Sequence, residues 1–236
     1  LFRPQRDETF VDQATRYVDL HRPDGKPDLL QQIEQGALGL VAQHRAFGRA
    51  IQTIIAPQLH QYHHLGDWST QTDGLPHDPS LAPFESNGKA SGTPDDRWAF
   101  TEKSSATNYA SSAALAAASR ALRGYDDALA AECLAAARKA WNDERAAGAG
   151  ETGWEAMFRQ GAELGSTLQL LMATKEKPYA DRFQELVWPA LERAPGFTVA
   201  AAVRAIPFFG PEYKERLVPH VRKYRSEIDS QYEENP

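Results

Sequence analysis

The stretch SATNYASSAALAAASRAL, residues 105–122, is the part of the sequence that decides the fold class. It is dense in alanine, and Gly124 is placed to end the helix that it predicts. Alanine occurs on both sides of this helix rather than on one face only. Small side chains on both sides let a helix approach two neighbours closely, so the stretch favours concentric layers of helices.

Helix signals continue on either side of this stretch. Pro27-Asp28 supplies the proline and the acidic residue that the first turn of a helix prefers, and Gly48 is placed to stop that helix. Asp126-Asp127 caps a third helix, whereas no segment after about Pro27 has a convincing strand pattern. The helices we expect are 27–48, 105–122, 126–141 and 154–173, followed by three shorter ones punctuated by Pro178, Pro195 and Pro211.

This order predicts an all-α chain of about seven helices. The helices have unequal lengths and show no strict period, which argues against tetratricopeptide or HEAT arrays with repeats of ~34 and ~40–47 residues. An α/α toroid fits the alanine-rich contact faces better. Because no such toroid closes with seven helices, we expect an incomplete sector of a barrel.

Bulk composition restricts the class of protein. The chain has 236 residues, a net charge of −6 and 42% hydrophobic residues, so we expect neither a nucleic-acid partner nor a membrane partner. No apolar run approaches the ~20 residues of a membrane-spanning helix, and no signal peptide precedes the first helix. The single cysteine, Cys133, is expected to be a buried and inert thiol. Because the chain starts at Leu1, we expect it to be a piece of something longer.

A loop at residues 60–104 has no apolar periodicity but is rich in aromatic residues, which disordered segments lack. Aromatic faces beside carboxylates, imidazole and guanidinium groups are suited to hold a sugar ring. The alternative is that the aromatic residues only pin the loop to the helices, with Trp98 and Phe100 as buried staples. For Trp98 this alternative is favoured slightly over stacking. The aromatic residues of the loop are Trp68, Phe84, Trp98 and Phe100.

Two other constellations in the sequence were weighed as sites. The three histidines His60, His63 and His64 are only a weak metal motif, because the glutamate of a zinc-protease helix does not lie between them. We therefore predict no metal and no cofactor, and interpret the histidines as donors to a substrate. Among the carboxylates, Asp95-Asp96 beside Arg97 is interpreted as a fixed ion pair that orients the loop. Glu102 and Glu163 could each face a barrel centre, but we interpret them as residues of solvated faces.

Several segments together resemble a known family in their order along the chain. They are Pro27 to Gly36 (PDLLQQIEQG), His64 to Asp67 (HLGD), Asp95 to Thr101 (DDRWAFT) and Ala113 to Arg120 (AALAAASR). This order is similar to that in the middle of a glycoside hydrolase family 9 catalytic domain, in the bacterial branch of cellulase-like and glucosidase-like enzymes. Residues 1–236 would then be the central portion of one catalytic domain.

The resemblance implies an (α/α)6 barrel that hydrolyses β-glycosidic bonds by inversion, with one carboxylate as base and a glutamic acid as acid. The family places its base in an Asp-Ala-Gly-Asp motif upstream of the first helix, and its acid well downstream of the last one. Neither has a counterpart here, so we expect no catalytic residue in this chain. The resemblance assigns His64 to sugar binding. It also matches Arg97 to an arginine of the family, and Trp68, with a one-residue offset, to a tryptophan of the family. With Asp67 and Trp98 they form the predicted substrate-binding set.

The predicted function is therefore that of a fragment of a secreted or periplasmic hydrolase acting on β-glucan or cello-oligosaccharides. Its partners would be the oligosaccharide or polysaccharide substrate and the remaining segments of the same barrel. One alternative is another α/α-barrel carbohydrate enzyme, such as a polysaccharide lyase or an unsaturated uronyl hydrolase, although these would favour a more basic cleft than a pI of about 5.7 suggests. The other is a non-catalytic helical carbohydrate-binding or scaffold module.

Overall fold

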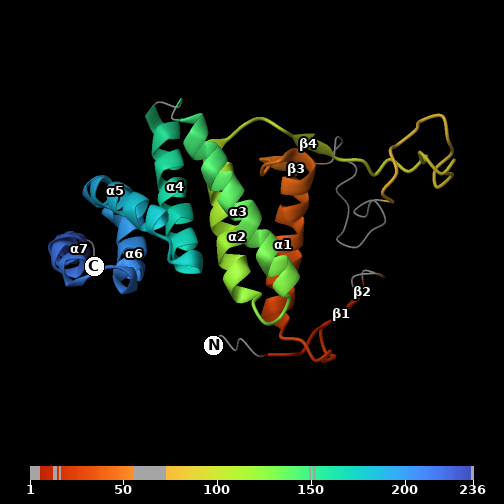
Figure 1. Cartoon of the computed structure of the whole chain (residues 1–236). Coiled ribbons are helices and arrows are strands. Elements are labelled where there is room, and N and C mark those ends of the chain that lie inside the picture. Colours follow the sequence, from red (N-terminus) through yellow and green to blue (C-terminus); the bar gives the residue numbers. More distant parts are fainter. Residues whose placement is uncertain are drawn as a thin grey trace. The chain divides into compact units, whose positions relative to one another are not determined.

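A computed structural model describes residues 6–12, 15, 17–55, 73–148, 150 and 153–234 of the chain (Figure 1). The chain divides into two compact units, one formed by residues 1–50 and 105–236 and the other by residues 51–104. The elements of the first unit are β1 (Phe10–Asp12), β2 (Tyr17–Asp19), α1 (Asp28–Phe47), α2 (Ser105–Ala121), α3 (Asp127–Ala147), α4 (Gly153–Thr174), α5 (Lys177–Arg193), α6 (Pro195–Ala205), the 3₁₀ helix η3 (Ile206–Phe208) and α7 (Pro211–Glu234); those of the second are β3 (Thr53–Ile55) and β4 (Trp98–Phe100).

The helix ends follow the local sequence signals. Gly48 ends α1 in the left-handed conformation, with φ of 70°, which glycine adopts without steric cost. Asp126 caps α3, because its side chain accepts a hydrogen bond from the backbone N–H of Leu129 at 2.9 Å. The predicted positions of these helices are therefore confirmed, and the described residues contain the seven α-helices that the sequence indicates.

Alanine and serine make close helix contacts around α2, which packs against both α3 and α4 (Figure 1). The Ser112 hydroxyl on α2 donates to the backbone carbonyl of Ala137 on α3 at 2.8 Å. From α4, the hydroxyl of Ser166 reaches the same Ser112 at 2.7 Å. These short polar contacts satisfy buried hydroxyls where two backbones come close together, so the predicted role of the alanine-rich helix is confirmed.

Helix α4 belongs to both of the hydrophobic cores. Its Leu170 and Leu171 lie in the core that α1, α2 and α3 share. Leu164 and Leu168 of the same helix pack with Phe183 of α5 in a second core, which extends to α6 and α7. The two cores therefore share one helix, α4.

Two expectations from the sequence are corrected. Three-residue strands do occur after Pro27, because β3 and β4 pair antiparallel with Ile55 opposite Trp98. The last helix is not short, since α7 has 24 residues and continues through Pro219. Neither change alters the all-α class.

The start of the chain is held to α1 by carboxylates rather than by an apolar core. Asp28 accepts hydrogen bonds from the backbone N–H groups of Glu8 and Thr9, at 3.1 and 3.0 Å. Asp7 accepts from Asp24 and Gly25 in the same way, at 2.9 and 2.8 Å.

Within the described part of the chain, no helix combines the length and the apolar character that crossing a membrane requires.

Candidate functional site

The predicted substrate-binding residues are only partly within the described structure. His64, Asp67 and Trp68 lie outside the described residues, as do His60 and His63. Arg97 and Trp98 are described, in the smaller unit at residues 51–104. The juxtaposition of all five side chains therefore remains a prediction.

Trp98 lies on β4 with its side chain open to solvent. It is 64% exposed, and Phe100 on the same strand is 42% exposed. The expectation that these two aromatic residues are buried staples is therefore wrong. Phe84, at 70% exposed, is a third aromatic residue that this unit leaves uncovered.

The aspartates of the loop order its backbone. Asp95 is buried and accepts a hydrogen bond from the backbone N–H of Asp73. Asp96 accepts from the backbone N–H of His77 at 2.8 Å. Gly92 allows two segments of the loop to approach closely, because a Cβ there would overlap the carbonyl oxygen of Ala82. Both aspartates thus help to order the loop. Their ion pair with Arg97 stays a prediction.

A cluster of charged side chains extends from the middle of α4 toward the end of the larger unit where α2 and α4 begin and α3 ends, which we call the rim (Figure 1). Glu163 on α4 is fully buried, which overturns its assignment to a solvated face, whereas Glu102 is exposed as expected. Three guanidinium groups surround the Glu163 carboxylate, with N···O distances of 2.7 Å from Arg182, 3.5 Å from Arg145 and 3.7 Å from Arg159.

Further polar groups extend this cluster along the rim. Asn108, at the start of α2, donates from Nδ2 to Glu144 on α3 at 2.9 Å and accepts from the backbone N–H of Ala50 at 3.1 Å. The Arg159 guanidinium lies over the ring of Tyr109, 5.6 Å from its centroid. Burial, together with the nearby charge of Glu163, raises the pKa of Tyr109 to about 12. Both carboxylates at this rim are thus held by neighbouring side chains.

Exposed apolar side chains stand at the rim beside this cluster, and the sequence analysis missed them. We call Trp154, Met157 and Phe158 of α4 the aromatic platform; their exposures are 70%, 51% and 50%. The Trp154 and Phe158 rings meet edge to face, with centroids 4.4 Å apart and planes at 85°. At least half of each side chain is exposed, so both rings are accessible to a ligand. The sequence did contain a signal for this platform, because Trp154 directly follows the glycine-rich break at residues 148–153. That position was interpreted only as the start of a helix.

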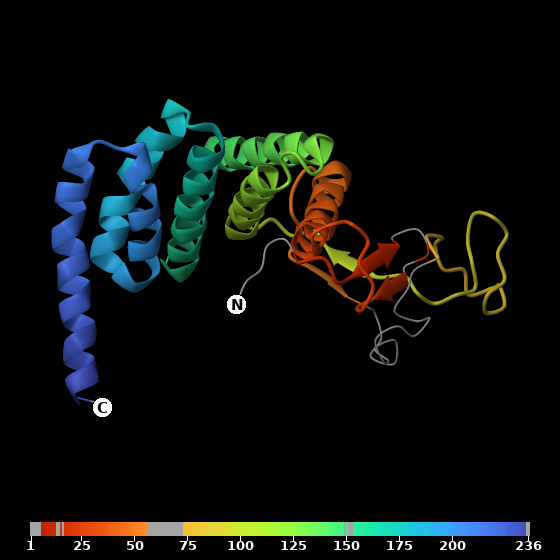
Figure 2. The same ribbon diagram turned by 90° about the horizontal axis from the view of Figure 1, so that it is seen from below.

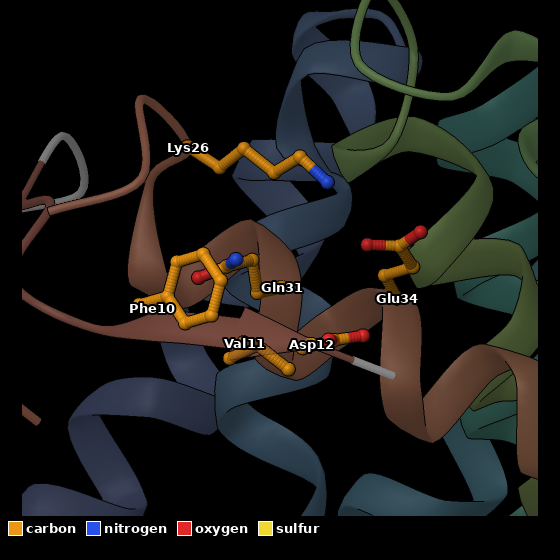
Figure 3. Close-up of a pocket in the computed structure, with 6 residues that line it drawn as sticks. All are labelled: Phe10, Val11, Asp12, Lys26, Gln31 and Glu34. Carbon is orange, nitrogen blue, oxygen red and sulfur yellow. The ribbon is translucent and has the colours of Figure 1, made fainter. Parts of the chain in front are cut away.

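A separate cavity of about 430 Å³ lies at the opposite end of α1, next to β1. Figure 3 shows Lys26 and Glu34 extending toward one another, with Phe10 beside Gln31. Glu34 accepts a hydrogen bond from the hydroxyl of Tyr125 at 2.9 Å. Because a helix of 20 residues is roughly 30 Å long, the cavity is well removed from the end of α1 where the long loop begins. Its lining is Phe10, Val11, Asp12, Lys26, Gln31 and Glu34.

Two other sequence predictions concern metal and thiol chemistry. Among the residues that the structure covers, no group of three or more His, Cys, Asp or Glu side chains is arranged to hold a metal ion. The buried thiol of Cys133 is confirmed. Burial raises the pKa of Cys133 to about 11, so the thiolate nucleophile is scarce near neutral pH.

Comparison with known proteins identifies the fold. No protein-family model and no curated protein sequence matches the chain. Its structure is similar to the crystal structure of a metagenome-derived glycoside hydrolase family 9 endoglucanase, with a TM-score of 0.51 and 18% sequence identity. The match covers 84% of this chain and 35% of that chain, so this chain spans about a third of its neighbour's length. The all-α fold, as part of an α/α barrel, is thus confirmed.

Proposed function

We propose that this chain is part of a glycoside hydrolase that cleaves β-glycosidic bonds of β-glucan or cello-oligosaccharides with inversion. The observation that carries the proposal is the fold likeness to a glycoside hydrolase family 9 endoglucanase over 84% of the chain. The order of motifs along the sequence, from PDLLQQIEQG to DDRWAFT, resembles that of the same family.

The catalytic carboxylates of the proposed reaction lie outside this sequence, with the base upstream and the acid downstream. Several described carboxylates support this, because they are held in structural roles. Glu163 is paired with arginines and Glu144 with Asn108. Asp95 and Asp96 accept hydrogen bonds from the loop backbone. We infer that residues 1–236 alone do not turn over substrate.

We propose that the substrate is held by His64, Asp67, Trp68, Arg97 and Trp98. His64 would donate to a sugar hydroxyl, Asp67 would accept from one, and an exposed indole would stack on the apolar face of the ring. The 64% exposure of Trp98 supports its role, because stacking requires an accessible ring face. By the same reasoning, the 70% exposure of Trp154 would let the aromatic platform stack on a sugar ring.

The setting of the enzyme is also proposed. A polymeric glucan substrate suits a secreted or periplasmic protein, and further helices of the same barrel would complete the fold around this sector. Neither a nucleic acid nor a membrane is among the proposed partners, and the reaction needs no cofactor, because hydrolysis by two carboxylates requires only water.

The test uses the full-length parent protein on cello-oligosaccharides, with the anomer of the first product followed by NMR. We expect release of the α-anomer, and a loss of roughly tenfold or more in kcat/KM for His64→Ala with the helical circular dichroism unchanged. Production of the β-anomer would refute inversion. Activity only on uronate-containing glycans would favour the lyase or uronyl hydrolase alternative, and binding without cleavage the carbohydrate-binding module. Turnover by residues 1–236 alone would place the catalytic pair within this chain.

A further inference from the structure

A group of three arginines lies at the end of α4 that is opposite the rim. They come from three segments, which are the last turn of α2, the turn that follows α2, and the last turn of α6. Their partners on α4 are Gln169, Met172 and Ala173, which are spaced at i, i+3 and i+4 and so share one face of that helix. We call these arginines the basic triad; they are Arg120, Arg123 and Arg204.

The acceptors of the basic triad are neutral. Arg120 donates to a side-chain amide oxygen, Arg123 to a backbone carbonyl at 3.0 Å, and Arg204 to a thioether sulfur at 3.6 Å. A thioether is a weak acceptor, and each guanidinium has five N–H donors. Most donors of the triad therefore have no acceptor among the described residues and can serve a ligand.

Within the part of the chain that the structure describes, no carboxylate forms an ion pair with the basic triad. The acidic residues that follow these segments along the chain have other contacts. Asp127 accepts a backbone hydrogen bond at 2.8 Å, and Glu176 pairs with Arg138 at 2.7 Å. Glu212, after α6, lies against Gly210. The positive charge of the triad is thus not offset by these carboxylates.

The helix ends offset only part of this charge. The last turns of α2, α4 and α6 meet at the triad, and each helix C-terminus carries about −0.5 of an elementary charge, or about −1.5 together. Against three guanidinium charges, a surplus of about +1.5 remains. The three charges also act on one another, because burial lowers the pKa of Arg120 and the charges of Arg204 and Arg123 lower it further.

The basic triad is accessible to a small solute. Figure 2 shows that α4 lies between α2 and α6, as it does in Figure 1, and α4 contacts both. Further helices of a barrel would be added at the edges of this sector rather than between α2 and α6. Arg123 and Arg204 are exposed and Arg120 is half-buried. The donors therefore stand in solvent, on a surface that helices of this chain already flank on two sides.

We propose that the basic triad binds a phosphoryl group, either as free phosphate or as the phosphate of a monoester. Guanidinium groups match phosphate oxygens in a bidentate geometry. A phosphoryl group offers at least three acceptor oxygens, so each arginine can meet a different one, whereas a carboxylate has two oxygens. Its charge of about −1.5 to −2 near neutral pH offsets the surplus of the triad. This inference does not depend on the proposed function.

Phosphorus-31 NMR of inorganic phosphate, titrated with the full-length parent protein, tests the proposal. At an ionic strength of about 0.01 M, where the Debye length is roughly 30 Å, we expect saturable binding with a dissociation constant on the order of 1 mM. Binding should weaken at about 0.15 M, where the Debye length is roughly 8 Å. Absence of saturable binding would overturn the proposal, as it would if a carboxylate from elsewhere in the barrel occupied the triad.

Charge-removing variants locate the site. Arg204→Gln should raise the dissociation constant for phosphate roughly 3–10-fold, because it removes one charged donor from an exposed position. Arg193→Gln is the matched control, since it removes the same charge from the last turn of α5, outside the triad. It should leave binding unchanged, with circular dichroism verifying helicity in both variants. Equal weakening by the two substitutions would contradict a defined site, because it would show attraction to overall positive charge.

Two sugar derivatives identify the ligand. Glucose 6-phosphate and glucuronate carry a phosphate and a carboxylate on the same kind of ring, and each is added as a competitor of inorganic phosphate. Binding of glucose 6-phosphate more tightly than inorganic phosphate would assign the site to a monoester, and equal or weaker binding would assign it to the free ion. We expect glucuronate to bind more weakly than either phosphate compound. Glucuronate that displaces phosphate as well as glucose 6-phosphate does would refute recognition of a phosphoryl group.

Discussion

Replacing Glu163 by glutamine removes one negative charge from the centre of the arginine cluster and changes the side-chain volume little. Arg159 is most affected, because its side chain is only 10% exposed and water cannot readily replace the lost carboxylate. Breaking a buried ion pair by removing one partner costs about 3–5 kcal/mol. Arg182 and Arg145 are 24% and 38% exposed, so solvent recovers part of this cost. We expect a loss of about 2–4 kcal/mol in the free energy of unfolding.

Urea unfolding followed by far-UV circular dichroism measures this loss. With a slope of about 3 kcal/mol per molar urea, the midpoint of Glu163→Gln should fall by roughly 1 M. Glu185→Gln is the matched control, because Glu185 also pairs with Arg182, at 2.8 Å, but its side chain is 61% exposed. An exposed pair contributes at most about 1 kcal/mol, so this control should shift the midpoint by a few tenths of a molar or less.

The interpretation of Glu163 as the organising charge of the rim is open to refutation. Equal effects of Glu163→Gln and Glu185→Gln would show that burial gives Glu163 no special role. A double-mutant cycle with Arg182→Gln should give a coupling energy above about 1 kcal/mol, as expected for residues in one network. Coupling near zero would show that the 2.7 Å contact between the two side chains contributes nothing to stability.

Three further predictions concern other parts of the chain. Trp154→Ala in the full-length parent should weaken retention in a β-glucan affinity gel roughly 3–10-fold, whereas Ile228→Ala should not change it. Gly92→Ala should open the loop at residues 73–104 to limited proteolysis without loss of helical signal, because its Cβ would overlap the Ala82 carbonyl; an uncut loop would contradict this. Burial lowers the pKa of His44, so the unfolded state binds more protons just below pH ~6.5 and stability should fall as the pH drops below that value. His44→Gln should flatten this part of the stability curve.

Local signals were sufficient to predict the helices. Gly48 and Asp126 fix helix ends through backbone conformation and capping, which depend on residues only a few positions away. The alanines of α2 predicted close packing because their small size constrains any neighbour. Proline was less informative, since Pro219 lies inside α7 rather than at an end.

Exposure was the property that the sequence could not supply. Trp98 and Trp154 are both open to solvent, whereas Trp141 and Trp188 are buried, and nothing in their immediate neighbours separates the two pairs. The burial of Glu163 could not be predicted from its local sequence either, because its partners Arg145 and Arg182 come from two other helices. The composition of the loop therefore predicted substrate-binding residues there, whereas the exposed aromatic residues of α4 were not predicted.

The hydrogen bond between the Ala50 N–H and the Asn108 side chain has a consequence for how this protein can change. It ties together the two places where residues 51–104 leave and rejoin the helical unit. A segment whose ends are already clamped can be lengthened, shortened or exchanged at little entropic cost, because doubling a loop adds only about 0.6 kcal/mol. The junction is thus a natural grafting point, where loops from other proteins could be installed on the same helices to alter what is recognised while the scaffold stays intact.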